Sequence, residues 1–126
     1  MNTSAFLESF LDKWETQARK GWLEFVILLS LGDREQYGFE LIADLKARTA
    51  IEVPEGSIYP VMIRLAKDEL VSSDWRVGEG GGEGGTPRKY YAVTPRGAEA
   101  TAAMLDRWDR LARAVAKLTI RRGLRP

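Results

Sequence analysis

The 126-residue chain contains neither cysteine nor histidine. Without cysteine there can be no disulfide and no thiolate metal site, and without either residue there is no Cys or His nucleophile chemistry. Only carboxylates remain for a metal or for acid–base catalysis, and none of them is clustered at the spacing that such a site requires. The sequence therefore predicts a protein that is not an enzyme and that needs no cofactor or metal.

Long apolar runs are also missing. The longest, Phe25–Leu29, is far shorter than a membrane span, and Glu8 and Asp12 stand where a targeting signal would place basic residues before an apolar run. The hydrophobic fraction of 44% and the charged fraction of 29% are typical of globular proteins. We expect a cytoplasmic protein with no membrane partner, and a length that suits one domain.

Charge is unevenly distributed along the chain. The formal net charge is only +1, but residues 1–70 hold 8 basic and 12 acidic side chains, whereas residues 71–126 hold 11 basic and 6 acidic ones. This asymmetry allows a local basic surface on a nearly neutral molecule.

Two helices are expected in the first 31 residues. Residues 4–19 place a wide apolar face on one helix, which packs either on its own subunit or on a partner; this face comprises Phe6, Leu7, Phe10, Leu11, Trp14 and Ala18. Gly21 is predicted to interrupt it. Trp22–Leu31 is apolar almost all round, which predicts a central buried helix ended by Gly32.

The next helix is expected at Tyr37–Arg48, where Gly38 permits close approach to a neighbouring helix. In the short connection that follows, Ile51 and Val53 have the spacing of a minimal strand.

The stretch 54–71 predicts an amphipathic helix with an unusual outer face. Its core-facing residues are Ile58, Met62, Leu65 and Ala66, and the exposed strip carries Tyr59, Pro60, Ile63, Arg64 and Lys67. With Ser57 as N-cap, Pro60 would lie in the first turn, where its missing N–H is tolerated. Such a helix has the dimensions to lie in a DNA major groove. The alternative is an ordinary amphipathic helix with a solvated basic face.

The period of the hydrophobic pattern then changes from 3.6 to 2. Val71–Val77 and Arg88–Thr94 read as two strands of a hairpin, joined by a glycine-rich tip that carries Glu79 and Glu83. Three helices followed by a two-stranded ribbon predict a mainly α winged helix-turn-helix domain. In this fold Arg76, Arg88 and Lys89, near the base of the wing, are the expected phosphate contacts.

A long helix is expected from Pro95, with Thr94 as its N-cap. Its apolar residues alternate at spacings of three and four, which is a heptad seam: Thr101, Met104, Trp108, Leu111, Val115 and Leu118. At about 39 Å for residues 95–120, the helix is too long for so small a domain to bury. We expect a homodimer whose interface includes Met104, Trp108, Leu111, Val115 and Leu118; the alternative is a helix that lies back on its own domain.

In order and spacing, several fragments resemble the PadR family of bacterial transcriptional regulators, in its branch with a short C-terminal region. They are G-F-E-L at 38–41, G-S-I-Y-P-V-M-I-R-L at 56–65, E-L-V at 69–71, Trp75 and P-R-K-Y-Y-A-V-T-P-R-G at 87–97. The resemblance implies a DNA-reading helix carrying Ser57, Tyr59, Pro60, Arg64 and Lys67, and a wing supported by Arg88, Lys89, Tyr90 and Tyr91. The chain departs from the family at Phe39, where tyrosine is frequent, and at Thr86, where arginine is frequent.

The resemblance, which covers about residues 21–120, also implies a dimeric repressor of a nearby promoter, controlled by a small ligand. From the order of the expected elements we predict residues 1–20 as a leading helix that packs on its own subunit or supports the dimer, 21–94 as the DNA-binding domain and 95–126 as the dimerisation helix and basic tail. Its DNA site would be a palindromic operator. Trp108 has two interpretations: it fills the dimer interface, or it forms a platform for a small aromatic effector. The competing hypothesis is a winged helix that binds a protein or sequesters a ligand without sequence-specific DNA binding.

Overall fold

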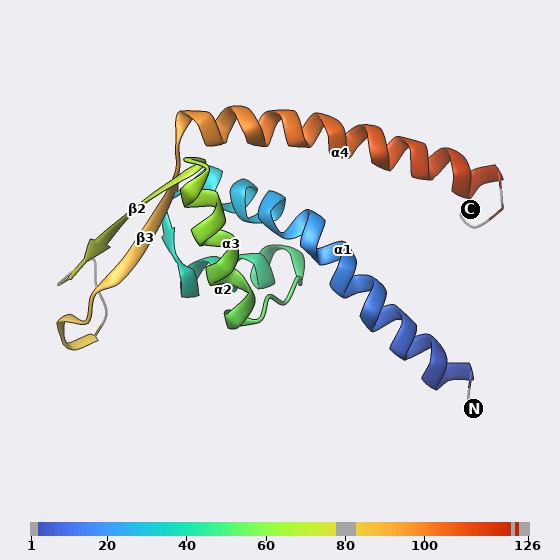
Figure 1. The fold of residues 1–126 in the computed structure, drawn as a ribbon, viewed down its shortest axis with the longest axis horizontal. Coiled ribbons are helices and arrows are strands. Elements are labelled where there is room, and N and C mark those ends of the chain that lie inside the picture. The colour runs from blue at the N-terminus through green and yellow to red at the C-terminus, as the bar shows by residue number, and fades with distance from the viewer. Residues whose placement is uncertain (1–2, 78–82, 122, 124–126) are drawn as a thin grey trace.

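The computed structural model describes residues 3–77, 83–121 and 123. Four helices and a three-stranded antiparallel sheet follow one another along the chain (Figure 1). Their bounds are α1 Thr3–Asp33, β1 Gln36–Tyr37, α2 Gly38–Thr49, α3 Glu55–Lys67, β2 Val71–Arg76, β3 Arg88–Val93 and α4 Pro95–Arg121, with a short 3-10 turn, η2, at Glu83–Gly85. The mainly helical winged fold is confirmed. Glu79 at the wing tip, and Arg122 and Arg125 in the tail, lie outside the described residues.

The first helix is one element, so the predicted interruption at Gly21 is wrong. A single glycine costs an α-helix only about 1 kcal/mol relative to alanine, and the burial of the following turns offsets this cost. Leu23, Ile27 and Leu28 are buried in the core, as the apolar run predicts. The face formed by Phe6, Leu7, Phe10, Leu11 and Trp14 is exposed instead.

The sheet contains a strand that the sequence did not predict. The two residues of β1 pair with β3, which lies between β1 and β2, with Gln36 opposite Tyr91 and Tyr37 opposite Tyr90. The expected strand at Ile51 and Val53 is wrong, because this connection has no strand structure. Val53 is buried in the core instead.

Helix α3 begins earlier than predicted. Pro54 is the N-cap, and the Ser57 N–H donates to its carbonyl at 2.9 Å, so Ser57 is not the cap. Pro60 therefore lies inside the helix, where it cannot donate to the carbonyl of the exposed Gly56. The buried face is Ile58, Val61, Met62 and Leu65; Val61 takes the place expected for Ala66, which is exposed.

The start of α4 is fixed against the turn between α3 and β2. Thr94 caps the helix, as predicted, by accepting a hydrogen bond from the Gly97 N–H at 3.0 Å, and its own hydroxyl donates to the Glu69 carbonyl at 2.6 Å. Gly97 lies so close to Leu70 that a Cβ would overlap the Leu70 carbonyl oxygen. From this joint α4 runs alongside the second half of α1, and the two helices diverge towards the chain termini (Figure 1).

Candidate nucleic-acid interface

The outer strip of α3 is exposed along its length. Ile63 is 69% exposed and Tyr59 44% exposed, and Pro60, Arg64 and Lys67 are also on the surface. The Tyr59 ring packs over the start of α2, where a Cβ on Gly38 would lie 3.3 Å from the Tyr59 hydroxyl. The absence of a side chain at Gly38 therefore lets α2 and the tyrosine of α3 approach closely.

The two cations of this strip differ in their surroundings. Arg64 is held by Glu24 of α1, with Nη2 3.1 Å and Nε 3.3 Å from the same carboxylate oxygen. Lys67 makes no ion pair with any residue that the structure describes. Among the residues that the structure describes, α3 thus presents Lys67 as a free cation, whereas the charge of Arg64 is neutralised by Glu24.

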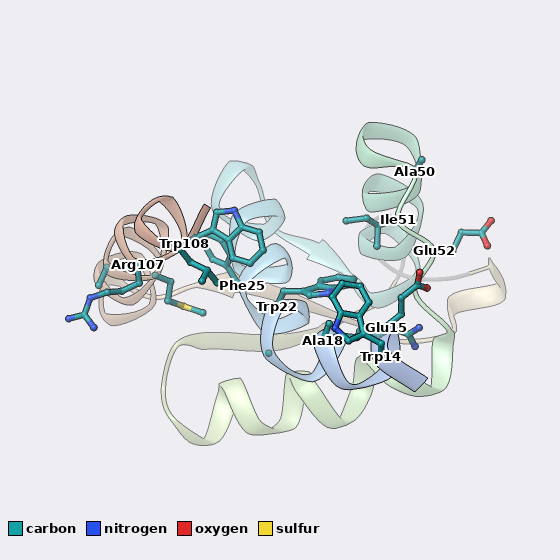
Figure 2. Close-up of a pocket in the computed structure, with 15 residues that line it drawn as sticks. Trp14, Glu15, Ala18, Trp22, Phe25, Ala50, Ile51, Glu52, Arg107 and Trp108 are labelled. Carbon is teal, nitrogen blue, oxygen red and sulfur yellow. The ribbon is translucent and has the colours of Figure 1, made fainter. Parts of the chain in front are cut away.

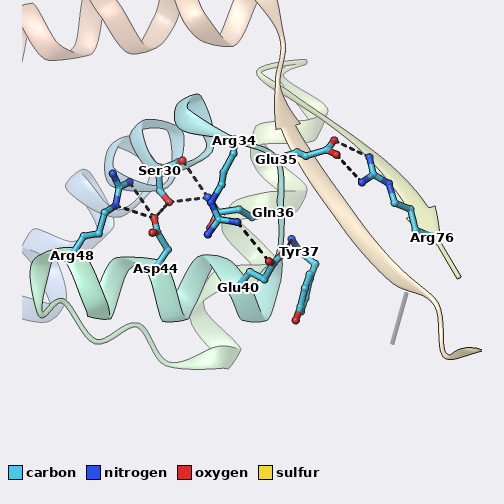
Figure 3. A network of polar contacts seen from close by, with 9 residues as sticks. All are labelled: Ser30, Arg34, Glu35, Gln36, Tyr37, Glu40, Asp44, Arg48 and Arg76. Carbon is cyan, nitrogen blue, oxygen red and sulfur yellow. Dashed lines mark hydrogen bonds and ion pairs between the residues drawn. The ribbon is translucent and has the colours of Figure 1, made fainter. Parts of the chain in front are cut away.

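Arg76 is the most constrained of the predicted phosphate contacts. Its guanidinium forms a two-pronged pair with Glu35 at 2.6 and 2.7 Å (Figure 3). It also donates to Asp74 at 3.1 Å. It lies over the Tyr90 ring, 4.3 Å from the centroid. The Arg76 hydrogen bond lowers the pKa of Glu35, and the pairs raise the pKa of Arg76 further above its usual value. Arg76 thereby fastens β2 to the segment that follows α1.

The other two wing cations lie on aromatic rings. Arg88 is 4.4 Å from the centroid of Tyr37, and Lys89 is 5.7 Å from Trp75 and 5.8 Å from Tyr91. Neither makes an ion pair with a carboxylate of the described residues. Their positive charge therefore remains available to a phosphate.

The two wing tyrosines occupy opposite faces of β3. Tyr90 meets Tyr37 edge to face, with centroids 5.4 Å apart, while Tyr91 is buried in the core, and this burial raises the pKa of its phenol. Both tyrosines thus tie the wing to the helical part of the domain.

A polar network holds the helix-turn-helix in place (Figure 3). The buried Ser30 hydroxyl donates to Asp44 at 2.6 Å, and the fully buried Gln36 amide donates to the Ser30 carbonyl at 3.1 Å and to its hydroxyl at 3.0 Å. Asp44 also pairs with Arg48 at 3.1 Å. The Ser30 hydrogen bond, followed by the charge of Arg48, lowers the pKa of Asp44. The network joins α1, β1 and α2.

A large apolar cavity lies between α1, α4 and the link after α2 (Figure 2). Its volume is about 1250 Å³, and its aromatic walls are Trp14, Trp22, Phe25 and Trp108. Trp108 meets Phe25 with ring centroids 5.9 Å apart but remains 46% exposed.

The predicted dimer seam lies along the same helix. Met104 packs against the core, whereas Leu111, Val115 and Leu118 are exposed in the single chain. The far half of α4 is therefore not covered by its own domain.

The described residues contain neither a membrane-spanning helix nor a cluster of metal ligands. None of their helices has both the length and the apolar character needed to cross a bilayer. Within residues 3–77, 83–121 and 123, no three carboxylates lie close enough together to hold a metal ion.

Comparison with known proteins establishes the family. The model of the transcriptional regulator PadR-like family matches residues 27–103, which span the end of α1, the helix-turn-helix, the wing and the start of α4. The chain belongs to the PadR-like family. It is a transcriptional regulator and not an enzyme.

Solved structures support the assignment, and one curated relative is also similar to this chain. A PadR family regulator from Eggerthella lenta has a TM-score of 0.77 and 29% identity, covering 90% of this chain and 96% of that one. A PadR-like regulator from Bacillus cereus has a TM-score of 0.69 and 33% identity, covering 81% and 95%. An uncharacterised protein from Lysinibacillus sphaericus is 28% identical over 91 residues, which cover 71% of this chain and 80% of the relative.

Sequence reasoning missed the carboxylates of this PadR-like domain. Glu24 lies 40 residues before Arg64, and Glu35 lies 41 residues before Arg76, so no local pattern pairs them. Glu24 and Ser30 were the visible signals, since both are polar residues inside the apolar run Trp22–Leu31 and a polar residue packed in such a run needs a hydrogen-bond partner.

Proposed function

We propose that this PadR-like protein is a dimeric repressor that binds a palindromic operator near its target promoter in the cytoplasm. The observation that carries this proposal is the exposed strip of α3, with Tyr59, Ile63 and Lys67, beside the unpaired wing cations Arg88 and Lys89. The helix would enter the major groove, and the wing cations would contact phosphates along the backbone. Arg64 and Arg76 would join them if phosphates displace their carboxylates.

Dimerisation is supported by apolar surface that one chain leaves bare. Phe6, Phe10 and Trp14 project from the first half of α1, and Leu111 and Leu118 project from α4, each at least 50% exposed. A second copy would cover these faces. In that dimer the two α3 helices would reach successive major grooves, about 34 Å apart.

An effector site is supported by the aromatic cavity. Its volume of about 1250 Å³ is large enough for a drug-sized molecule, and Trp108 of α4 lines it together with Phe25 of α1. A planar aromatic or hydrophobic ligand would stack on Trp108 and change the relation of α1 to α4, and thereby DNA binding. Titration of the intrinsic tryptophan fluorescence with a panel of planar aromatic compounds tests this part.

The decisive experiment is a gel-shift titration against the DNA upstream of the gene, with unrelated duplex as competitor, at several salt concentrations. Tight, competitor-resistant binding is expected. Three free cations per subunit predict a log–log salt slope of magnitude about 5 for the dimer, and release of Arg64 and Arg76 raises it to about 9. A slope near 1 would contradict the proposed footprint.

The second candidate is a ligand-sequestering module without sequence-specific DNA binding. The neutralised Arg64 and Arg76 favour it, because they leave less free positive charge on the predicted DNA face. Binding to the upstream DNA no tighter than to the competitor, together with a fluorescence response to aromatic compounds, would select this candidate.

A further inference from the structure

Ile63 is the most exposed large apolar side chain of α3. It is 69% exposed, whereas Ile58, Met62 and Leu65 of the same helix are at most 1% exposed. Its position lies one turn after Tyr59 and one turn before Lys67, at the middle of the outer strip. Because the core is complete without it, the isoleucine side chain serves no packing role within the chain.

The rest of α3 has few ways to read base edges. The helix EGSIYPVMIRLAK contains no asparagine or glutamine, so it cannot make the two-pronged amide contact that identifies adenine. Its base-edge donors are limited to the hydroxyls of Ser57 and Tyr59, the ammonium of Lys67, and Arg64, which is paired with Glu24. For an A·T pair, the C5 methyl group of the thymine offers a further feature to recognise.

We propose that Ile63 reads the C5 methyl group of a thymine in the major groove. The inference rests on the proposed function, since it requires α3 to enter that groove. Of the four bases only thymine presents an apolar group there, and a branched aliphatic side chain can bury it. Tyr59 and Lys67, on either side, would fix the register by contacts to the base edge or backbone.

The methyl contact should have a defined effect on binding affinity. Burial of one methyl group is worth about a fourfold change in affinity, so removal of the methyl from both half-sites of a dimer site should weaken binding about fifteenfold. Deoxyuridine differs from thymidine only in that methyl, and it pairs identically with adenine. Replacing dT by dU therefore isolates the contact without changing any hydrogen bond.

The test begins with selection of tight-binding duplexes from a random-sequence library by the full-length protein. Each thymine of the selected sequence is then replaced in turn by dU, and affinities are measured for the wild type and for Ile63→Ala. We expect one position per half-site at which dU costs the wild type about fourfold. Ile63→Ala should bind the dT and dU duplexes equally.

Lys67→Ala is the matched control on the same strip. It should weaken binding to the dT and dU duplexes by the same factor and lower the salt slope by about 0.9 per subunit. Ile63→Ala should leave the salt slope and the thermal midpoint unchanged, because the side chain is exposed and alanine suits a helix.

The outcomes separate the inference from the proposed function. If selection yields no preferred sequence, the proposed function fails. A preferred sequence in which dU is tolerated at every thymine would overturn the methyl contact and leave the proposed function standing. The same conclusion would follow if Ile63→Ala still discriminated dT from dU.

Discussion

Arg64 of α3 and Glu24 of α1 form an ion pair in which Nη2 and Nε of the arginine lie 3.1 and 3.3 Å from one carboxylate oxygen. The pair links the helix that is proposed to read DNA to the helix whose other face lines the aromatic cavity through Trp22 and Phe25. A phosphate or a base edge must compete with Glu24 for the guanidinium. In the proposed complex, DNA affinity would therefore depend on a residue that need not touch DNA.

Glu24→Gln should strengthen binding to random-sequence duplex. Loss of the carboxylate frees Arg64, and one more available cation per subunit raises the salt slope by about 0.9. Fluorescence anisotropy at several salt concentrations measures both quantities. Glu15→Gln, on the same helix at the cavity, changes the net charge equally and is the control. Equal slopes for the two variants would show that the Glu24 pair does not restrain Arg64.

Asp44→Asn should destabilise the fold in a pH-dependent manner. The folded pKa of Asp44 lies below its ordinary value of 3.8, because the carboxylate accepts hydrogen bonds from Ser30 and Arg48. The stabilisation is complete above that ordinary value and is lost as pH falls through the lowered one. The wild type should be more stable by about 1.5–3 kcal/mol at pH 7, since its hydrogen bonds are to a charged group.

Urea unfolding of both proteins from pH 7 to pH 3 tests the Asp44 prediction. The gap in unfolding free energy should narrow below about pH 4 as Asp44 takes up its proton. Asp106→Asn, which removes an exposed pair with Arg110 on α4, should have little effect at any pH. A gap that stays constant with pH would show that the charge of Asp44 is not what stabilises the network.

Gly21→Ala should stabilise the protein. A Cβ at this position meets no atom within 4 Å, and alanine is favoured over glycine in a helix interior by about 1 kcal/mol. The thermal midpoint and the urea midpoint should both rise. A lower midpoint would indicate that α1 bends at Gly21, as the sequence pattern suggested.

Gly97→Ala, in contrast to Gly21→Ala, should destabilise the protein. The added Cβ would overlap the Leu70 carbonyl oxygen and lie 2.9 Å from Val93 Cγ1. The backbone oxygen cannot move without disturbing the turn between α3 and β2. Overpacking of this kind costs about 1–3 kcal/mol. Urea unfolding measures the loss, with Gly21→Ala as the matched substitution at an open site. Unchanged stability would show that the backbone at Leu70 shifts to accommodate the added Cβ.

The successes of sequence reasoning follow from long periodic signals. Thirteen residues of α3 and six in each of β2 and β3 are enough to show a period of 3.6 changing to 2. The two-residue strand β1 has no period to detect, and its pairing with β3 follows only from tertiary packing. Gly21 was predicted to break the helix because helix propensity is a local property. The burial of Leu23, Ile27, Leu28 and Leu31, which keeps α1 continuous past Gly21, depends on tertiary packing and is not visible locally.

The candidate site also combines features that local sequence predicts with features that depend on tertiary packing. Which side chains face outward on α3 follows from the helical wheel, and Tyr59, Ile63 and Arg64 are exposed as expected. Whether a cation there is free depends on carboxylates some 40 residues away, such as Glu24 and Glu35. Spacing along the chain carries no information about such pairs.

Helix α1 is long and unbroken. The helix extends over 31 residues, about 46 Å, without a hinge at Gly21. Its aromatic first half and Glu24 belong to one continuous helix, so a tilt imposed at Phe6 or Trp14 would be transmitted to the arginine of α3. A partner that covers the bare part of α1 would thus change how firmly Glu24 withholds Arg64 from other partners.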